Sequence, residues 1–180
     1  MLNAAAATGC FQIMAVADLD RQKAEKTAAE LGCEAYCDYR QLIVQNQLDC
    51  LLVAAETHTC DEQLKAAMKR KFNILKLPPP ARSFEEALEY VQLAESEKVR
   101  FAVANAAWFR SSYATAHELI SQGHVEQVFL VAACGTMPAA DRPAWQTDPK
   151  LAGGGVLLHD CYQMVDQILR SFPIPEQVYA

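Results

Sequence analysis

Asp18 is the first residue whose type and position suggest chemistry. It follows the apolar run Phe11–Ala17, a pattern that predicts a short buried strand. An acidic side chain at the end of such a strand can accept hydrogen bonds from the 2′-hydroxyl of a nucleotide ribose. The Gly-x-Gly-x-x-Gly turn that binds the pyrophosphate in such sites does not occur in the sequence. The pattern therefore indicates the ribose side of a nucleotide site without its phosphate-binding turn.

Two His-x-Cys groups would bind zinc only if the fold brought them together. One is His58 with Cys60, and the other is His159 with Cys161. Structural zinc sites usually space their cysteines by two to four residues, whereas each pair here has one intervening residue. We therefore predict no metal site. The seven cysteines are expected to be small buried side chains in a reducing compartment.

Serine and aromatic side chains give two weaker signals. Ser111 and Ser112 lie near His117 in the sequence, but no Gly-x-Ser-x-Gly elbow accompanies them. Nucleophilic catalysis is therefore not predicted. Trp145 is interpreted as a packing residue or as an aromatic platform for a substrate.

The composition excludes several classes of protein. The chain has 180 residues, of which 52% are hydrophobic and 21% charged, so it can bury a core and is not a disordered tail. A net charge of −6 disfavours a general nucleic-acid binder. No apolar run approaches the roughly 20 residues that span a bilayer, and the first residues do not resemble a signal peptide. We therefore expect a cytoplasmic protein with neither nucleic-acid nor membrane partners.

Strands alternate with helices in the first part of the chain. Apolar runs predict strands over residues 11–18, 48–55, 72–75 and 100–104, with helices between them at 21–31, 59–69 and from Ser83 to about 97. This alternation is typical of βαβ units with a parallel sheet, so the fold class is α/β. We expect the strands at 11–18, 48–55 and 72–75 to be parallel neighbours.

The pattern changes after residue 105. A helix is predicted over Tyr113–Ser121, a strand over Gln127–Cys134 and a helix from Val156 to about Phe172. We therefore expect an incomplete doubly wound domain over residues 1–105, followed by a second region over residues 106–180 with a different pattern of elements. The chain begins at the helix that normally follows the first strand and the Gly-rich loop, so both of these are expected to be missing.

Five stretches of the sequence match the pattern of one known family. The segment Asp148–Leu157 contains DP-x-x-AGGG-x-L, and Lys71–Ala87 is similar to a GKHVLCEKPLA…EEA stretch. The others are Phe11–Asp20, Asp49–His58 and Gly123–Val128. Together they resemble the glucose–fructose oxidoreductase/inositol dehydrogenase/MocA family of NAD(P)-dependent oxidoreductases.

The resemblance implies a fold and an activity. It implies a Rossmann domain that lacks its first strand and Gly-rich loop, then part of an α+β substrate domain whose sheet mediates self-association. It implies NAD or NADP as cofactor, and hydride transfer at a hydroxyl of a sugar, polyol or cyclitol. The chain is expected to be the middle part of a full-length member.

The resemblance also assigns cofactor-binding residues. Asp18 would hold the adenosine ribose. Ala55, Glu56 and His58 would line the nicotinamide side, and Leu77 falls within the family's Glu-Lys-Pro motif.

The catalytic positions of the family are replaced. Its lysine aligns with Pro78, and Lys76 lies two residues earlier. Its paired Asp and His align with His159 and Gln163, which a continuous helix would present on one face. Histidine can exchange a proton near neutral pH, whereas glutamine can only hydrogen-bond. We therefore expect weak or no activity; the alternative is a non-catalytic Rossmann-derived binding or assembly module.

Overall fold

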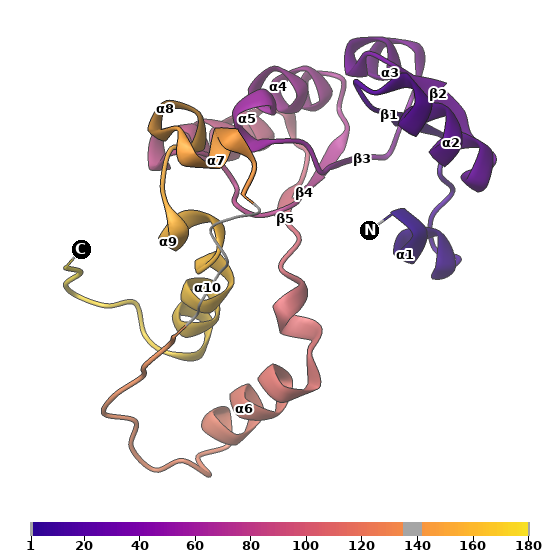
Figure 1. Cartoon of the computed structure of the whole chain (residues 1–180). Coiled ribbons are helices and arrows are strands. Elements are labelled where there is room, and N and C mark those ends of the chain that lie inside the picture. Colours follow the sequence, from indigo (N-terminus) through magenta and orange to yellow (C-terminus); the bar gives the residue numbers. More distant parts are fainter. Residues whose placement is uncertain (1, 135–141, 180) are drawn as a thin grey trace. The chain divides into compact units, whose positions relative to one another are not determined.

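The computed structural model describes residues 2–134 and 142–179. Figure 1 labels the α-helices and the strands. The elements follow one another as α1 (Leu2–Ala7), β1 (Ala15–Ala17), α2 (Arg21–Leu31), β2 (Glu34–Tyr36), α3 (Tyr39–Gln45), β3 (Cys50–Val53), η1 (Thr57–Thr59), α4 (Asp61–Lys69), β4 (Asn73–Lys76), α5 (Phe84–Glu97), β5 (Phe101–Val103), η2 (Ala106–Phe109), α6 (Ser111–Ser121), α7 (Ala144–Thr147), α8 (Pro149–Ala152), α9 (Val156–His159) and α10 (Tyr162–Ser171). Strands and helices alternate up to β5, which confirms the α/β prediction.

The five strands of the described residues form two sheets. In the first, β1 pairs in parallel with β2, and Val16 is opposite Ala35. The second has the order β3-β4-β5. Ile74 donates to the carbonyl of Arg100, and Ala104 donates to the carbonyl of Lys76. Partner numbers rise together along β4 and β5, so these strands are also parallel.

The predicted neighbour order was wrong at one point. Residues 48–55 and 72–75 are neighbours, as β3 and β4, but residues 11–18 pair with β2 instead of β3. In the doubly wound order 3-2-1-4-5-6, the second strand does not touch the fourth. The observed pair β2-β1 agrees with the 3-2 part of that order, and the observed β3-β4-β5 agrees with the 4-5-6 part.

Local signals set the boundaries of α2. The Asp20 carboxylate accepts hydrogen bonds from the backbone N–H groups of Gln22 and Lys23, which would otherwise lack partners in the first turn. At the other end, Gly32 adopts a left-handed conformation with φ 67° and donates to the Ala28 carbonyl. The helix therefore begins and ends where the sequence predicts.

Two predicted elements differ in the structure. No strand forms over residues 127–134, where Phe129 is 92% exposed, because nothing in the described part of the chain pairs with this segment. The helix predicted from Val156 to Phe172 is interrupted at Asp160 and Cys161, which separate α9 from α10. The Asp160 carboxylate is engaged there by the guanidinium of Arg142.

The prediction of buried cysteines was also wrong for most of them. Cys60 is buried, Cys33 and Cys161 are half-buried, and Cys10, Cys37, Cys50 and Cys134 are exposed. The small side chains of the four exposed cysteines lie in loops and at a strand end that other described residues do not cover.

The chain forms two compact units. Unit 1 comprises Met1–Val53, Thr59–Leu75 and Tyr90–Phe101, and unit 2 comprises Ala54–His58, Lys76–Glu89 and Ala102–Ala180. The division into domains 1–105 and 106–180 stays a prediction. Among the described helices, none combines the length and the hydropathy of a membrane span.

Part of the core of unit 1 is formed by α4 and the residues that lead into β4. Leu64, Met68 and Phe72 are fully buried there, and each buried apolar side chain of this size contributes about 1.5–3 kcal/mol. The ring of Tyr90 lies 5.9 Å from that of Phe101, and its hydroxyl donates to Asp61 Oδ1 at 3.1 Å. This core supports the β3-β4-β5 sheet.

Unit 2 contains a close backbone contact at Gly153. This glycine has φ 73°, and a Cβ built on it would lie 2.7 Å from the Cα of Arg82 and still closer to the carbonyl oxygen of that residue. The glycine-rich turn that follows α8 therefore packs directly on the segment between β4 and α5. Only glycine satisfies both the positive φ and the short separation.

Replacing Gly153 with alanine should lower the free energy of unfolding by about 2–4 kcal/mol, because a strained backbone conformation and an overlap add together. Gly32→Ala is the matched control: it has a similar φ of 67° but no neighbour within 4 Å of the added Cβ. It should cost only about 1 kcal/mol. Urea unfolding of both variants measures the difference, and equal costs would contradict the close contact.

Candidate functional site

Asp18 directly follows β1 in unit 1. Its backbone N–H donates to the carbonyl of Tyr36 at 3.2 Å, which extends the pairing of β1 with β2. Its Oδ1 accepts a hydrogen bond from the backbone of Asp20 at 2.8 Å. The side chain is exposed, so its carboxylate stands accessible at the carboxyl end of a parallel strand.

The residues Ala55, Glu56 and His58 belong to unit 2 and follow β3. Ala55 and Glu56 are exposed, while Thr57 is buried and begins the short helix η1. His58 Nε2 lies 3.5 Å from Glu56 Oε2. His58 Nδ1 is buried and has no hydrogen-bond partner in the part of the chain that the structure describes.

Lys76 is the last residue of β4 and is only 1% exposed. Its Nζ donates to the carbonyl of Leu77 at 3.1 Å and to that of Pro79 at 2.6 Å. The ammonium therefore stabilises the turn that follows β4. Leu77 itself is half-buried and contributes its backbone carbonyl to this arrangement.

His159 is the last residue of α9, and a hydrogen bond fixes its imidazole. Nε2 lies 3.0 Å from the carbonyl oxygen of Ala152, the last residue of α8. A carbonyl oxygen only accepts, so Nε2 carries the hydrogen. In the neutral ring this leaves Nδ1 as an acceptor, and no partner for Nδ1 lies among residues 2–134 and 142–179.

Trp145 brings the two predicted histidines of unit 2 together. Its ring centroid lies 5.5 Å from that of His58, with an interplanar angle of 47°. It lies 5.4 Å from that of His159, with an angle of 81°. These three side chains form the ring group, whose members come from η1, α7 and α9. Two residues of the predicted site therefore share one aromatic neighbour.

Gln163 lies on α10, half-buried, beyond the break at Asp160. Because α9 ends at His159, the continuous helix predicted to present His159 and Gln163 on one face does not form, and their shared face stays a prediction. The guanidinium of Arg142 pairs with Asp160, the residue after His159, and both side chains are largely buried.

A second polar group in unit 2 surrounds Asp166. Its Oδ2 accepts hydrogen bonds from Asn105 Nδ2 at 2.6 Å and from Trp108 Nε1 at 2.9 Å. Arg170 pairs with the same carboxylate and lies 4.7 Å above the Trp108 ring. Burial raises the pKa of Asp166, but the hydrogen bonds and the Arg170 charge outweigh it, so the pKa is lowered overall.

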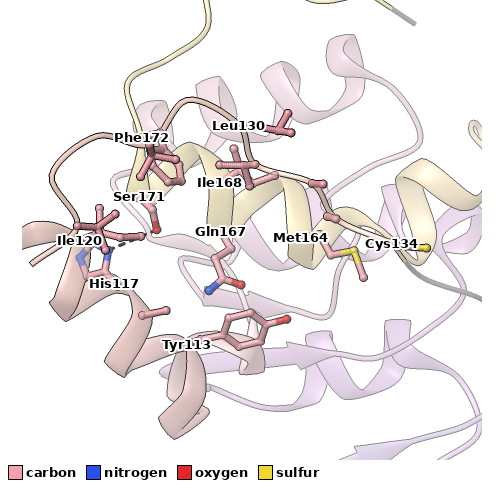
Figure 2. Close-up of a pocket in the computed structure, with 16 residues that line it drawn as sticks. Tyr113, His117, Ile120, Leu130, Cys134, Met164, Gln167, Ile168, Ser171 and Phe172 are labelled. Carbon is pink, nitrogen blue, oxygen red and sulfur yellow. Dashed lines mark hydrogen bonds between the residues drawn. The ribbon is translucent and has the colours of Figure 1, made fainter.

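A cavity of about 620 Å³ lies elsewhere in unit 2. Figure 2 shows side chains of α6 and α10 around it, with Leu130 and Cys134 from the irregular segment between them. His117 Nδ1 lies 3.4 Å from Ser171 Oγ on its wall, so His117 is paired with neither Ser111 nor Ser112. None of the predicted site residues lines this mostly apolar cavity, so it is not the candidate site.

The predicted site residues are not arranged as metal ligands. Across the described ranges, no three His, Cys, Asp or Glu side chains converge closely enough to hold an ion.

Comparison with known proteins identifies the family. Residues 1–105 match the family described as "Oxidoreductase family, NAD-binding Rossmann fold". The chain belongs to this family. Across 152 residues it is 26% identical to an uncharacterized oxidoreductase of Streptococcus pneumoniae, covering 81% of this chain and 41% of the relative. It is 23% identical to a dTDP-3,4-didehydro-2,6-dideoxy-alpha-D-glucose 3-reductase of Streptomyces antibioticus, covering 81% of this chain and 44% of that protein.

Solved structures of NAD-binding proteins have a similar fold. The crystal structure of an NAD-binding protein from Listeria innocua superimposes with a TM-score of 0.74 at 20% identity. The match covers 89% of this chain and 47% of the Listeria chain. The predicted Rossmann-type α/β fold is therefore confirmed. The chain spans less than half the length of these relatives.

The described residues fit one end of the cofactor of the NAD-binding Rossmann family. An exposed carboxylate at the carboxyl end of a parallel strand, as at Asp18, can accept hydrogen bonds from a ribose diol. A glycine-rich phosphate turn is not among the residues described. The fit therefore concerns the adenosine end.

Sequence reasoning missed Arg142 and Asp166. Asp166 and Arg170 have the i, i+4 spacing of a helical ion pair, and that spacing was the available signal. Nothing local indicates that Asn105 and Trp108 donate to Asp166, because they lie far away in the sequence.

In the Asp166→Asn variant, the stability of the fold should depend less on pH in the acidic range than it does in wild type. A carboxyl with a lowered folded-state pKa contributes stability above its unfolded pKa of about 3.9 and loses it as the pH falls through the folded value. The variant should therefore melt below wild type at pH 7, and the gap should close towards pH 3. Melting temperatures measured across this range test it, with exposed Glu176→Gln as control; a gap independent of pH would contradict the lowered pKa.

Proposed function

We propose that the chain belongs to an NAD(P)-linked oxidoreductase that acts on a hydroxyl of a sugar, polyol or cyclitol. The chain would contribute the residues that bind the ribose of the nucleotide and the residues that contact the substrate. Membership of the NAD-binding oxidoreductase family supports the reaction class. The name of the Streptomyces relative, a reductase of a nucleotide-linked sugar, supports the substrate class. The observation that carries the proposal is the ring group, in which Trp145 brings His58 and His159 together.

His159 is proposed as the proton acceptor. A nicotinamide, when bound, accepts hydride from the carbinol carbon, so the protein must take the proton of the hydroxyl. The hydrogen bond to Ala152 leaves His159 Nδ1 as the acceptor atom. Gln163 would hydrogen-bond a substrate hydroxyl without accepting its proton.

Lys76 is proposed to act structurally. Its ammonium donates to two carbonyls of the turn and is almost fully buried, so moving it to a substrate would break both hydrogen bonds. Proton transfer therefore falls to His159. The burial and pairing of Lys76 also favour the second candidate function, which is a nucleotide-binding module without turnover. Cofactor binding with no oxidation of any hydroxyl substrate distinguishes this module from the enzyme.

His159→Gln tests the proton acceptor. Glutamine can still donate to the Ala152 carbonyl but cannot take a proton, so kcat/KM should fall by about 100-fold or more. NADH formation from NAD⁺ is followed with myo-inositol and with D-glucose as substrates. His124→Gln, which changes an exposed histidine, should retain wild-type rates. Equal rates for wild type and His159→Gln would remove His159 from the mechanism.

Asp18 is proposed to favour NADH over NADPH. Its carboxylate can accept from the two ribose hydroxyls of NADH, whereas it repels the 2′-phosphate of NADPH. Bound cofactor stabilises the folded state, so the melting temperature reports binding. Up to millimolar concentrations, NADH should raise the melting temperature more than NADPH does.

Asp18→Ala should weaken NADH binding about tenfold or more, since a hydrogen bond to a charged group contributes about 1.5–3 kcal/mol. Glu30→Ala changes another exposed carboxylate of unit 1 and should leave the shift intact. If neither cofactor shifts the wild-type melting temperature, nucleotide binding by this chain is rejected.

A further inference from the structure

Trp145 is held in a short, well-anchored stretch of unit 2. It lies on α7, which is followed directly by α8. The Asp148 carboxylate caps α8 by accepting from the backbone of Lys150 at 2.9 Å. Ala152 ends α8 and receives the hydrogen bond of His159. The indole and the carbonyl that orient His159 therefore come from one continuous segment.

Two contacts at different points constrain the His159 ring. The Ala152 carbonyl fixes the direction of Nε2, while the indole packs nearly perpendicular to the imidazole. A hydrogen bond alone leaves the ring free to pivot about the bond axis, whereas an aromatic neighbour at T-shaped geometry limits that motion. Together the contacts fix the position of Nδ1.

The His58 ring depends on the same indole. Its Nε2 faces the exposed carboxylate of Glu56 at 3.5 Å, and its buried Nδ1 lacks a partner within the described residues. The 5.5 Å ring contact with Trp145 therefore constrains its orientation. Asp160, which follows His159 in the sequence, is paired with Arg142.

We propose that Trp145 is a positioning residue shared by His58 and His159, which sets both imidazoles through a single side chain. The two ring contacts do not depend on the proposed function. The expected effect on turnover does rest on it, because His159 Nδ1 must face the reacting hydroxyl. If Trp145 merely fills space, an apolar side chain of another shape serves equally well.

Nuclear magnetic resonance of the full chain tests the shared contact without cofactor. In wild type, the indole protons of Trp145 should show nuclear Overhauser contacts to the ring protons of both His58 and His159. The imidazole signals are assigned with the single variants His58→Gln and His159→Gln. Absence of either contact overturns the proposal, whatever the outcome of any activity assay.

Variants separate positioning from space filling. In Trp145→Leu, the ring-proton signals of both histidines should move towards those of exposed His124, whereas Trp145→Phe should keep them displaced. The His117 signal should not move, because His117 packs on Trp108 at 5.5 Å. Trp108→Leu should move the His117 signal and leave the signals of His58 and His159 unchanged. Movement of one histidine alone, or none, in Trp145→Leu overturns the proposal.

Kinetics measure the consequence for the proposed reaction. Trp145→Leu should lower kcat about tenfold with the KM for NAD⁺ unchanged, and Trp145→Phe should restore most of it. An unchanged kcat contradicts the positioning role. Absence of turnover in wild type instead rejects the proposed function, while the resonance experiment still decides whether Trp145 holds both rings.

Discussion

The arrangement of the candidate site depends on how closely the Gly153 backbone approaches that of Arg82. No side chain fits between them, so the glycine-rich turn packs directly on the segment that follows β4. This contact fixes the end of α8, where the Ala152 carbonyl holds the imidazole of His159. Two stretches that are far apart in the sequence, at Arg82 and at Gly153, thereby pack against each other. The positive φ of Gly153 makes this close packing possible.

The polar groups of unit 2 divide into structural and chemically available ones. The Lys76 ammonium stabilises a turn, and the Asp166 carboxylate joins Asn105 and Trp108. Arg142 is neutralised by Asp160. Nδ1 of His159 is instead an acceptor without a partner in the described part of the chain, which is the property a general base requires. The hydrogen bond of His159 to Ala152 therefore supports its proposed role independently of its alignment with a family position.

The family and the chemistry are supported at different levels. Family membership follows from the match over residues 1–105, and the fold follows from the agreement with solved relatives. The chain spans less than half of those relatives, so the activity of the whole protein stays a proposal. The proposed nucleotide binding rests on the position of Asp18 after β1, and the proposed proton transfer rests on the two imidazoles of the ring group.

The sequence by itself determined the local structure and the family. The caps Asp20, Gly32 and Asp38 set helix ends through hydrogen bonds that reach at most a few residues along the chain, so their signals are local. The apolar runs likewise indicated the strands, although not their order.

Only the tertiary structure decided which strands pair and which side chains meet. The strand predicted over residues 127–134 failed because a strand needs a hydrogen-bonding partner, which its own sequence cannot supply. The break at Asp160, with its Arg142 partner, and the contacts of Trp145 with His58 and His159 join residues that are separated along the chain. Such contacts depend on how the backbone folds back on itself, and no local pattern of residues encodes them.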